Sequence, residues 1–143
     1  MEHLRAVPIG EFMIRDLITL HLDDTLADAY QKMHDHLIRH LPVVNDAGEI
    51  LGLFSQFDLQ KAYAPRETEE GWYYDKGELE LLSLKHFMTS EVLTMTPQNS
   101  LKEAAETMAR TKYGCIPIVE PGTKKLVGII SYVDVLHKIA SIL

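Results

Sequence analysis

The residues whose types and spacing best suit ligand binding form a Ser-x-x-Asp pattern that occurs twice. The two copies are Ser55 with Asp58 and Ser131 with Asp134. Each pattern stands where an apolar run gives way to a helical one. A serine hydroxyl and the backbone N–H groups of a helix N-terminus suit a phosphate, and a carboxylate three residues on can accept two ribose hydroxyls. The same pattern is typical of a helix start, with serine as N-cap and aspartate as a favourable first-turn charge. Local sequence leaves both interpretations open.

A basic pair, Arg39 and His40, precedes the apolar residues 41–44. Arginine offers a planar fork of donors that suits a phosphate. Histidine adds positive charge only when it is protonated, so a bound anion would be held less tightly as pH rises. The second copy has Gly114 and Cys115 at this place. The alternative interpretation of the basic pair is the solvated end of a helix.

The other reactive residue types carry weaker signals. His34 and His36 point to different faces of a helix, and no Cys or acid stands at a metal-ligand spacing, so we expect no metal site. Cys115 lies in a predicted core strand and is expected to be structural. No nucleophile–base set or Gly-rich phosphate loop has a credible spacing, so we expect no catalytic residue and no enzyme activity.

Composition limits the class of protein. The chain has 143 residues, of which 46% are hydrophobic and 24% charged, which is typical of a soluble globular domain. The net charge of −7 argues against a nucleic-acid partner. No apolar stretch approaches the roughly 18 residues that a membrane helix needs, no signal-peptide core follows the N-terminus, and the single cysteine fits a reducing compartment. We expect a cytoplasmic protein with neither nucleic acid nor membrane as a partner.

The elements that must position these residues come from an internal repeat. Residues 12–44 match residues 87–119 at an offset of 75, and residues 52–58 match residues 128–134 at an offset of 76. The extra residue falls in a turn, where an insertion is tolerated. Each copy reads as strand, helix, strand, strand, helix. The predicted strands are 17–20, 41–44 and 50–54 in the first copy, and 92–95, 115–119 and 126–130 in the second.

Helices are expected between the first two strands and after the last strand of each copy. In the first copy Leu26, Ala29, Tyr30, Met33 and Leu37 share one face at helical spacing. In the second copy a capping box, Ser100 with Glu103, starts the helix. The closing helices run from about 57 to 63 and from about 133 to the C-terminus.

The predicted fold class is α/β (α+β), with two pseudo-symmetric β-α-β-β-α repeats packed as one module, because about 55 residues are marginal alone. The repeats span residues 7–64 and 84–143. Between them, residues 65–83 form a linker that is acidic and is expected to be exposed. Its aromatic residues Trp72, Tyr73 and Tyr74 could dock a partner or cover the core of the protein itself, and both alternatives stay open.

Several motifs carry a family resemblance. They are Phe87-Met88-Thr89, Thr96-Pro97, the sequence Gly-Cys-Ile-Pro-Ile-Val at 114–119 and Leu-Val-Gly-Ile-Ile-Ser-Tyr-Val-Asp at 126–134, with echoes at 41–44 and 51–58. Their order resembles a tandem CBS-domain pair, or Bateman module, over roughly residues 7–142. The resemblance implies that an adenosine-type ligand (AMP, ADP, ATP or S-adenosylmethionine) binds in the cleft between repeats, with no required cofactor. It also implies a homodimer that, standing alone, regulates an unknown effector protein in trans.

The resemblance also implies which residues bind the ligand. Serine contacts phosphate, aspartate contacts ribose, and backbone groups near Thr19 and Thr94 read the adenine edge, unless these are ordinary strand residues. Arg39 and His40 would serve the Asp134 site and leave the Asp58 site weaker or empty. The expected set is Ser131, Asp134, Arg39, His40, Ser55, Asp58, Thr94, Met95, Thr96, Ile116, Pro117, Thr19, Leu20 and His21. The competing hypothesis is a ligand-independent dimeric scaffold.

Overall fold

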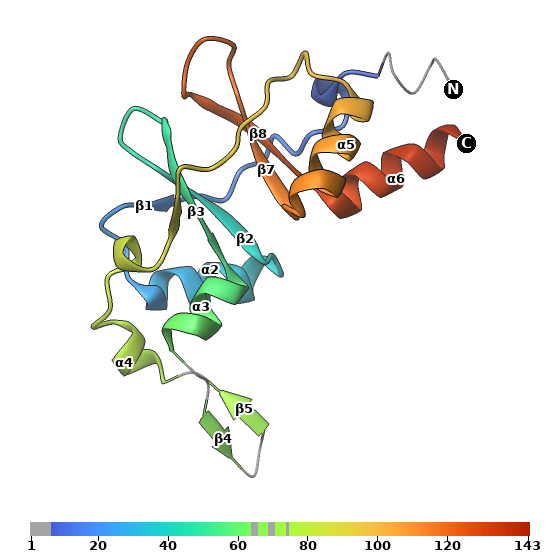
Figure 1. The fold of residues 1–143 in the computed structure, drawn as a ribbon. Helices are drawn as coiled ribbons and strands as arrows, with labels where there is room; N and C mark the ends of the chain where they lie inside the picture. Colours follow the sequence, from blue (N-terminus) through green and yellow to red (C-terminus); the bar gives the residue numbers. More distant parts are fainter. Residues whose placement is uncertain (1–6, 64–65, 69–70, 74) are drawn as a thin grey trace. The chain divides into compact units, whose positions relative to one another are not determined.

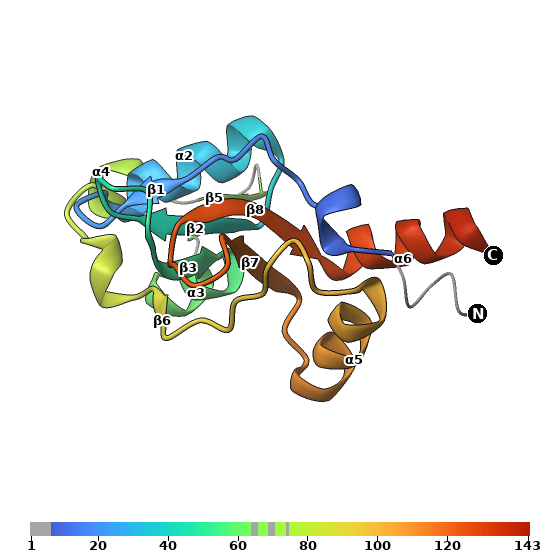
Figure 2. The ribbon, with the colours of Figure 1, turned by 90° about the horizontal axis from the view of Figure 1, so that it is seen from above.

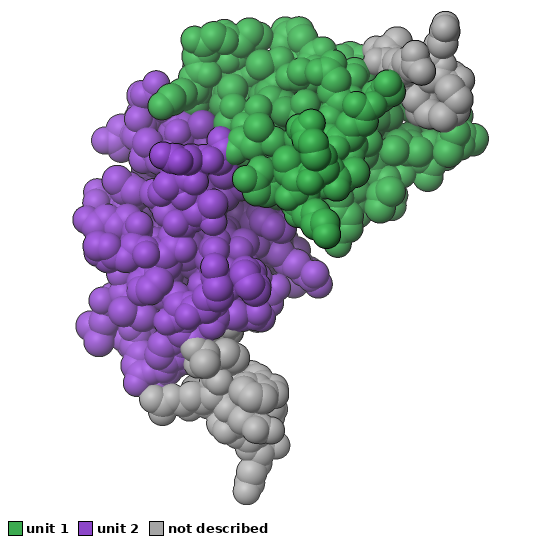
Figure 3. Space-filling model, in the orientation of Figure 1, with its two compact units in different colours: residues 1–17, 93–143 green, residues 18–92 purple. Residues whose placement is uncertain are grey.

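The chain folds into two compact units. The structure, a computed structural model, describes residues 7–63, 66–68, 71–73 and 75–143 (Figure 1). Unit 1 contains the residues up to Leu17 together with Leu93–Leu143, and unit 2 contains Ile18–Val92 (Figure 3). Within these described ranges, no helix combines the length and the apolar character needed to cross a bilayer.

Unit 2 is built on a four-stranded sheet in the order β1-β2-β3-β6. Strand β1 (Leu20–His21) runs parallel to β2 (His40–Val44), and β2 runs antiparallel to β3 (Ile50–Ser55). Strand β6 (Thr89–Ser90) closes the sheet antiparallel to β3. The predicted hairpin is confirmed, with each strand one residue longer than expected. The predicted first strand is correct only in its last residue.

Two helices flank the hairpin of unit 2 (Figure 1). Helix α2 (Leu26–His36) contacts β2 and packs against α3 (Gln56–Ala62), which follows β3 directly. The apolar face of α2 enters the core, but Leu37 was wrongly predicted to share it. The helix ends at His36, Leu37 takes a left-handed φ of 54° as its C-cap, and its side chain is 90% exposed.

The linker is more structured than the sequence indicates. Strands β4 (Arg66–Thr68) and β5 (Gly71–Tyr73) pair antiparallel, and α4 (Lys76–Leu79) packs against α2. Leu79 is fully buried in the core of unit 2, so the expectation of an exposed linker is wrong at this end. The side chains of the aromatic run at 72–74 lie outside the described residues.

Unit 1 repeats this plan with differences (Figure 2). Strands β7 (Cys115–Val119) and β8 (Leu126–Ser131) form the predicted hairpin, and α5 (Leu101–Thr111) packs against α6 (Tyr132–Ile142). The predicted capping box starts α5, since Ser100 Oγ accepts a hydrogen bond from the Glu103 N–H at 3.0 Å.

The strand predicted at residues 92–95 is absent, and Met95 makes only an isolated parallel bridge to Ile118. The backbone N–H of Thr96 donates to Asn99 Oδ1 at 2.8 Å. The counterpart bond in unit 2, from the His21 N–H to Asp24 Oδ2 at 2.8 Å, accompanies a strand of two residues. The prediction is therefore wrong for unit 1, and this local bond does not explain the difference.

The compact units do not follow the sequence repeats. Ile14, from the segment that leads repeat 1, bridges Ile129 of β8, with N···O distances of 2.9 and 3.0 Å. In the same way β6, from the segment that leads repeat 2, pairs with β3, where Thr89 stands opposite Leu53. Each unit therefore combines the body of one repeat with the leading segment of the other.

Two glycines make these pairings possible. A Cβ at Gly52 would lie 2.6 Å from the Thr89 carbonyl oxygen and 3.1 Å from Met88 Sδ. A Cβ at Gly128 would lie 2.6 Å from Met13 Sδ. The glycines are repeat counterparts, and so are the two methionines. Each hairpin thus lacks a side chain where the leading segment of the other repeat passes.

We expect Gly52→Ala to lower the free energy of unfolding by about 1–3 kcal/mol, because the added methyl group meets backbone that cannot move aside. Gly128→Ala should cost less, since its nearest contact is the flexible end of Met13. Urea unfolding of both variants tests the order. Gly114→Ala is the control, because a Cβ there meets only Tyr132 at an ordinary 3.5 Å. A loss at Gly52 no larger than the control's would contradict the expectation.

Candidate functional site

The Ser-x-x-Asp patterns form capping boxes in both units. Asp134 Oδ2 accepts from the Ser131 backbone N–H at 2.8 Å and from Ser131 Oγ at 3.0 Å, and the Asp134 N–H donates to Ser131 Oγ at 3.3 Å. Asp58 Oδ2 accepts from the Ser55 N–H at 2.8 Å, and the Asp58 N–H donates to Ser55 Oγ at 3.1 Å. The N-cap interpretation is confirmed.

The boxes leave part of each carboxylate available. Among the described residues, no hydrogen bond reaches Oδ1 of Asp134 or of Asp58. The two aspartates differ in access: Asp58 is 6% exposed and is the one buried charged side chain in the described part of the chain, whereas Asp134 is half-buried. A ribose hydroxyl can therefore be accepted at Asp134 without breaking the helix cap.

The basic pair lies beside the capping box of its own unit. His40 opens β2 and stands opposite Ser55 in the ladder, and the Gln56 N–H donates to the Arg39 carbonyl at 2.9 Å. The structure thus brings the pair to the Ser55–Asp58 box, although the sequence assigned it to the Asp134 site. The assignment to Asp134 stays a prediction.

Burial sets the charge of His40. Loss of hydration lowers the pKa of His40 below its ordinary value of 6.5, the negative charge of Asp58 opposes this, and the nearby Arg39 reinforces it. The imidazole is therefore mostly neutral at pH 7 and can donate or accept a hydrogen bond. Arg39 supplies the permanent positive charge at this end of the hairpin.

Cys115 stands where unit 2 has His40. It opens β7 opposite Ser131, and its side chain is 7% exposed. Burial and the negative charge of Asp134 raise the pKa of the Cys115 thiol to about 12. The thiol is protonated at neutral pH, and its place in a core strand is as predicted.

The segments expected to read an adenine edge already use much of their backbone. Leu20 is fully buried, and the Thr19 carbonyl accepts from Lys32 Nζ at 2.6 Å. In unit 1 the Met95 N–H donates to the Pro117 carbonyl at 3.1 Å, and the Met95 carbonyl accepts from Val119. Ile116 is fully buried and Pro117 is buried. An adenine base bound here must therefore hydrogen-bond to backbone N–H and C=O groups that these bonds do not already use.

Two residues beside these segments escaped the sequence reasoning. Asp24 Oδ2 accepts from the His21 N–H at 2.8 Å, and Asn99 Oδ1 accepts from the Thr96 N–H at 2.8 Å. Asp24 and Asn99 are 75 residues apart, at the repeat offset. That matched spacing, three residues after each segment, was the signal that could have identified them.

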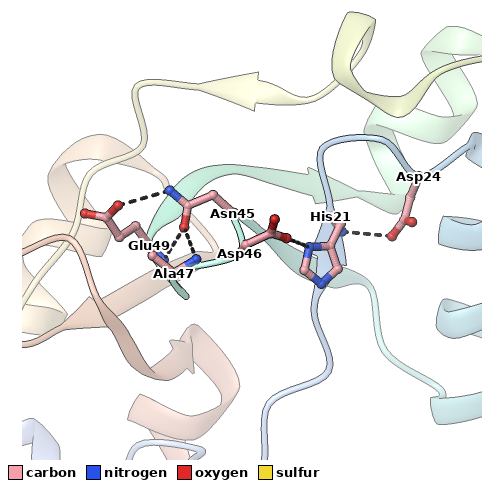
Figure 4. A network of polar contacts seen from close by, with 6 residues as sticks. All are labelled: His21, Asp24, Asn45, Asp46, Ala47 and Glu49. Atoms are coloured by element: carbon pink, nitrogen blue, oxygen red, sulfur yellow. Dashed lines mark hydrogen bonds and ion pairs between the residues drawn. The ribbon is translucent and has the colours of Figure 1, made fainter.

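The turn of the unit 2 hairpin is held by Asn45 (Figure 4). Its Oδ1 accepts from the Ala47 and Glu49 N–H groups at 3.0 and 2.9 Å, and its Nδ2 donates to Glu49 Oε1 at 3.0 Å. His21 Nδ1 lies 3.8 Å from Asp46 Oδ1, and both side chains are more than half exposed. No group of three or more His, Cys, Asp or Glu in the described ranges could hold a metal ion.

Comparison with known proteins adds a family match. Residues 9–65 and 84–141 match the model of the CBS domain. A homoserine O-acetyltransferase of Methanosalsum zhilinae is 28% identical over 127 residues, which are 89% of this chain and 23% of that protein. The chain spans about a quarter of the length of the first curated relatives that it matches.

Solved structures share the fold. A Vibrio cholerae protein named for acetoin utilization is 32% identical, with a TM-score of 0.77 over 95% of this chain and 92% of that one. CBSX2 in complex with AMP is 23% identical, with a TM-score of 0.78 over 95% and 98%. The CBS domain pair of MJ0100 in complex with 5′-methylthioadenosine and S-adenosyl-L-methionine is 20% identical, with a TM-score of 0.79 over 96% and 99%. The predicted mixed α and β fold of tandem repeats is confirmed.

Acidification should destabilise the protein partly through His40. Because the pKa of His40 is lower in the folded state than in the unfolded chain, the unfolded chain binds more protons, so the free energy of unfolding falls as pH drops below about 6.5. Urea unfolding between pH 7.5 and 5 should show a smaller loss for His40→Gln than for the parent chain. Equal losses in the two proteins would show that protonation of His40 does not contribute to the acid destabilisation.

The Cys115 thiol should be unreactive in the folded protein. We expect a disulfide reagent such as dithionitrobenzoate at pH 8 to modify it at least about a hundredfold more slowly than the guanidinium-unfolded chain, because the thiolate is the reacting form. The unfolded sample is the control. Equal rates before and after unfolding would show that the thiol is accessible and ionised.

Proposed function

Because this chain belongs to the CBS domain family, we propose that it is a regulatory module that binds an adenine nucleotide or a related adenosyl metabolite and signals to a partner protein. The observation that carries the proposal is the twofold Ser-x-x-Asp box at a strand-to-helix junction, with Oδ1 of each aspartate unbonded among the described residues. A similar fold that binds AMP and another that binds S-adenosyl-L-methionine support this ligand class.

Ribose recognition rests on Asp134. Its half-buried carboxylate keeps Oδ2 for the helix cap and offers Oδ1 to a ribose hydroxyl. Hydrogen bonds to an ionised acceptor are stronger than those between neutral groups, so this bond gives the ligand orientation as well as affinity. The Ser131 hydroxyl must turn from Asp134 to donate to a phosphate.

Phosphate recognition is assigned to Arg39 and His40. No hydrogen bond or ion pair joins the Arg39 guanidinium to another described residue, so its donors are available to an anion. A phosphate beside His40 would favour the protonated imidazole and draw the pKa of that group upward. Ligand affinity should accordingly fall as pH rises.

The regulatory mechanism is a population shift. A ligand that binds one conformation of the module more tightly than another shifts the population toward the first, by at most the difference between the two binding free energies. The partner protein then binds the favoured conformation. The protein would act as a homodimer and would carry no catalytic step of its own. The competing function is a dimeric scaffold without a ligand, which predicts an intact dimer that ignores nucleotides.

A thermal-shift panel of AMP, ADP, ATP, S-adenosylmethionine, NADH and cyclic nucleotides tests the proposal. A ligand at 100 times its dissociation constant adds about 2.7 kcal/mol, which should raise Tm by several degrees. Asp134→Ala should abolish the response to the active ligand, and comparison with Asp58→Ala assigns the ribose to one aspartate.

Asp134→Ala also removes the N3 acceptor of a capping box, so it lowers the free energy of unfolding by itself. The matched control is Glu103→Ala, which removes the N3 acceptor of the α5 capping box but should keep the full ligand response. No shift with any compound in the parent protein would favour the scaffold function.

A further inference from the structure

A hollow of about 360 Å³ opens in unit 2 where the C-terminal end of α2 faces α3. Met33, Ile38 and Leu59 give it an apolar lining, and the exposed Leu37 stands at its edge. We propose that this hollow binds a small amphipathic anion, a compact apolar body that carries one carboxylate, at a site that adjoins the Ser55–Asp58 box and shares Arg39 with the proposed phosphate contact.

Size and lining favour a small molecule. Sites for small ligands are typically about 300–1,000 Å³, mostly apolar, with a few polar groups that fix orientation. The polar groups here are the rings of Tyr30 and His34, whose centroids are 6.2 Å apart, the Gln56 amide and the Arg39 guanidinium. The lining shares only Arg39 with the residues assigned to the nucleotide.

Charge favours an anion with a single negative charge. None of the lining residues is acidic, although the whole chain has a net charge of −7. Arg39 is the permanent cation, and no described side chain forms an ion pair with it. One guanidinium pairs well with one carboxylate through two parallel hydrogen bonds, which is why we assign a monocarboxylate.

The second repeat carries different residues at the positions that line the hollow. Tyr132 is the counterpart of Gln56, and Gly114 is the counterpart of Arg39. The Tyr132 ring lies 3.5 Å from the place of a Gly114 Cβ, so it stands against the position that Arg39 occupies in unit 2. Two alanines, Ala105 and Ala109, replace the two rings. In unit 1 the two rings and the guanidinium are missing from these positions, and Lys112 stands at the counterpart of Leu37.

The repeat also supplies the blocking variant. Gln56→Tyr places in unit 2 the residue that unit 1 carries after an equivalent serine N-cap, so the capping box should persist while the ring occupies the hollow. The matched control is Gln60→Tyr, the same change at an exposed position one turn further along α3. Neither glutamine belongs to the proposed nucleotide site.

Amide NMR of the full ¹⁵N-labelled chain, titrated with sodium hexanoate and with 1-hexanol, tests the proposal. Hexanoate should shift the amide signals of Leu37, Ile38 and Gln56 saturably. It should bind at least about tenfold more tightly than hexanol, since a charge-assisted bond is worth that much. Gln56→Tyr should weaken hexanoate by about tenfold or more, and Gln60→Tyr should leave it unchanged.

Three results would overturn the proposal: equal binding of hexanol, shifts confined to other residues, or an unaffected Gln56→Tyr variant. Sedimentation of both variants, which measures the mass of the assembly in solution, tests whether a second copy of the chain covers the hollow. A change of mass with Gln56→Tyr but not with Gln60→Tyr would mean that a second copy of the chain covers the hollow.

Discussion

The absence of a side chain at Gly52 and Gly128 is the constraint on which the rest of the structure depends. At Gly52 the backbone of the other repeat approaches to a distance that a Cβ would prevent, and at Gly128 a Cβ would have to displace the end of Met13. Ile14 then pairs with Ile129, and Thr89 with Leu53. The close approach completes each compact unit with a segment distant in sequence. Neither repeat therefore builds a complete unit from its own residues.

The candidate binding ends show how one backbone design gives two electrostatic environments. Ser55 and Ser131 have nearly the same φ and ψ, and both start a helix with a reciprocal serine–aspartate box. Their ladder partners differ: His40 faces Ser55, and Cys115 faces Ser131. Burial keeps both groups uncharged at neutral pH, by lowering the pKa of His40 and raising that of Cys115. Arg39 is the permanent cation directly before His40, and Gly114 stands at its counterpart before Cys115.

The same contrast between backbone and side chain appears where the first helix of each repeat ends. Leu37 and Lys112 are counterparts, and both take a left-handed conformation as C-cap, with φ of 54° and 62°. A residue with a Cβ pays roughly 1–2 kcal/mol for that conformation, so the shared turn is a property of the fold. The side chains beyond the turn differ between the units: unit 2 has a hollow beside Arg39, and unit 1 has Gly114 next to the Tyr132 ring at the corresponding place.

The sequence by itself determined the repeats, both hairpins, the two helices of each repeat and the place of the Ser-x-x-Asp pairs at helix starts, because these depend on periodicity and on contacts three or four residues apart. It could not determine that residues 7–17 pack with the second repeat, since a glycine shows that a close approach is possible but not which segment makes it. Leu37 and Leu79 were misjudged for the same reason: a helix end and a tertiary contact decide their burial. Long-range packing therefore decided the composition of the units and the surroundings of His40, while local patterns decided the elements.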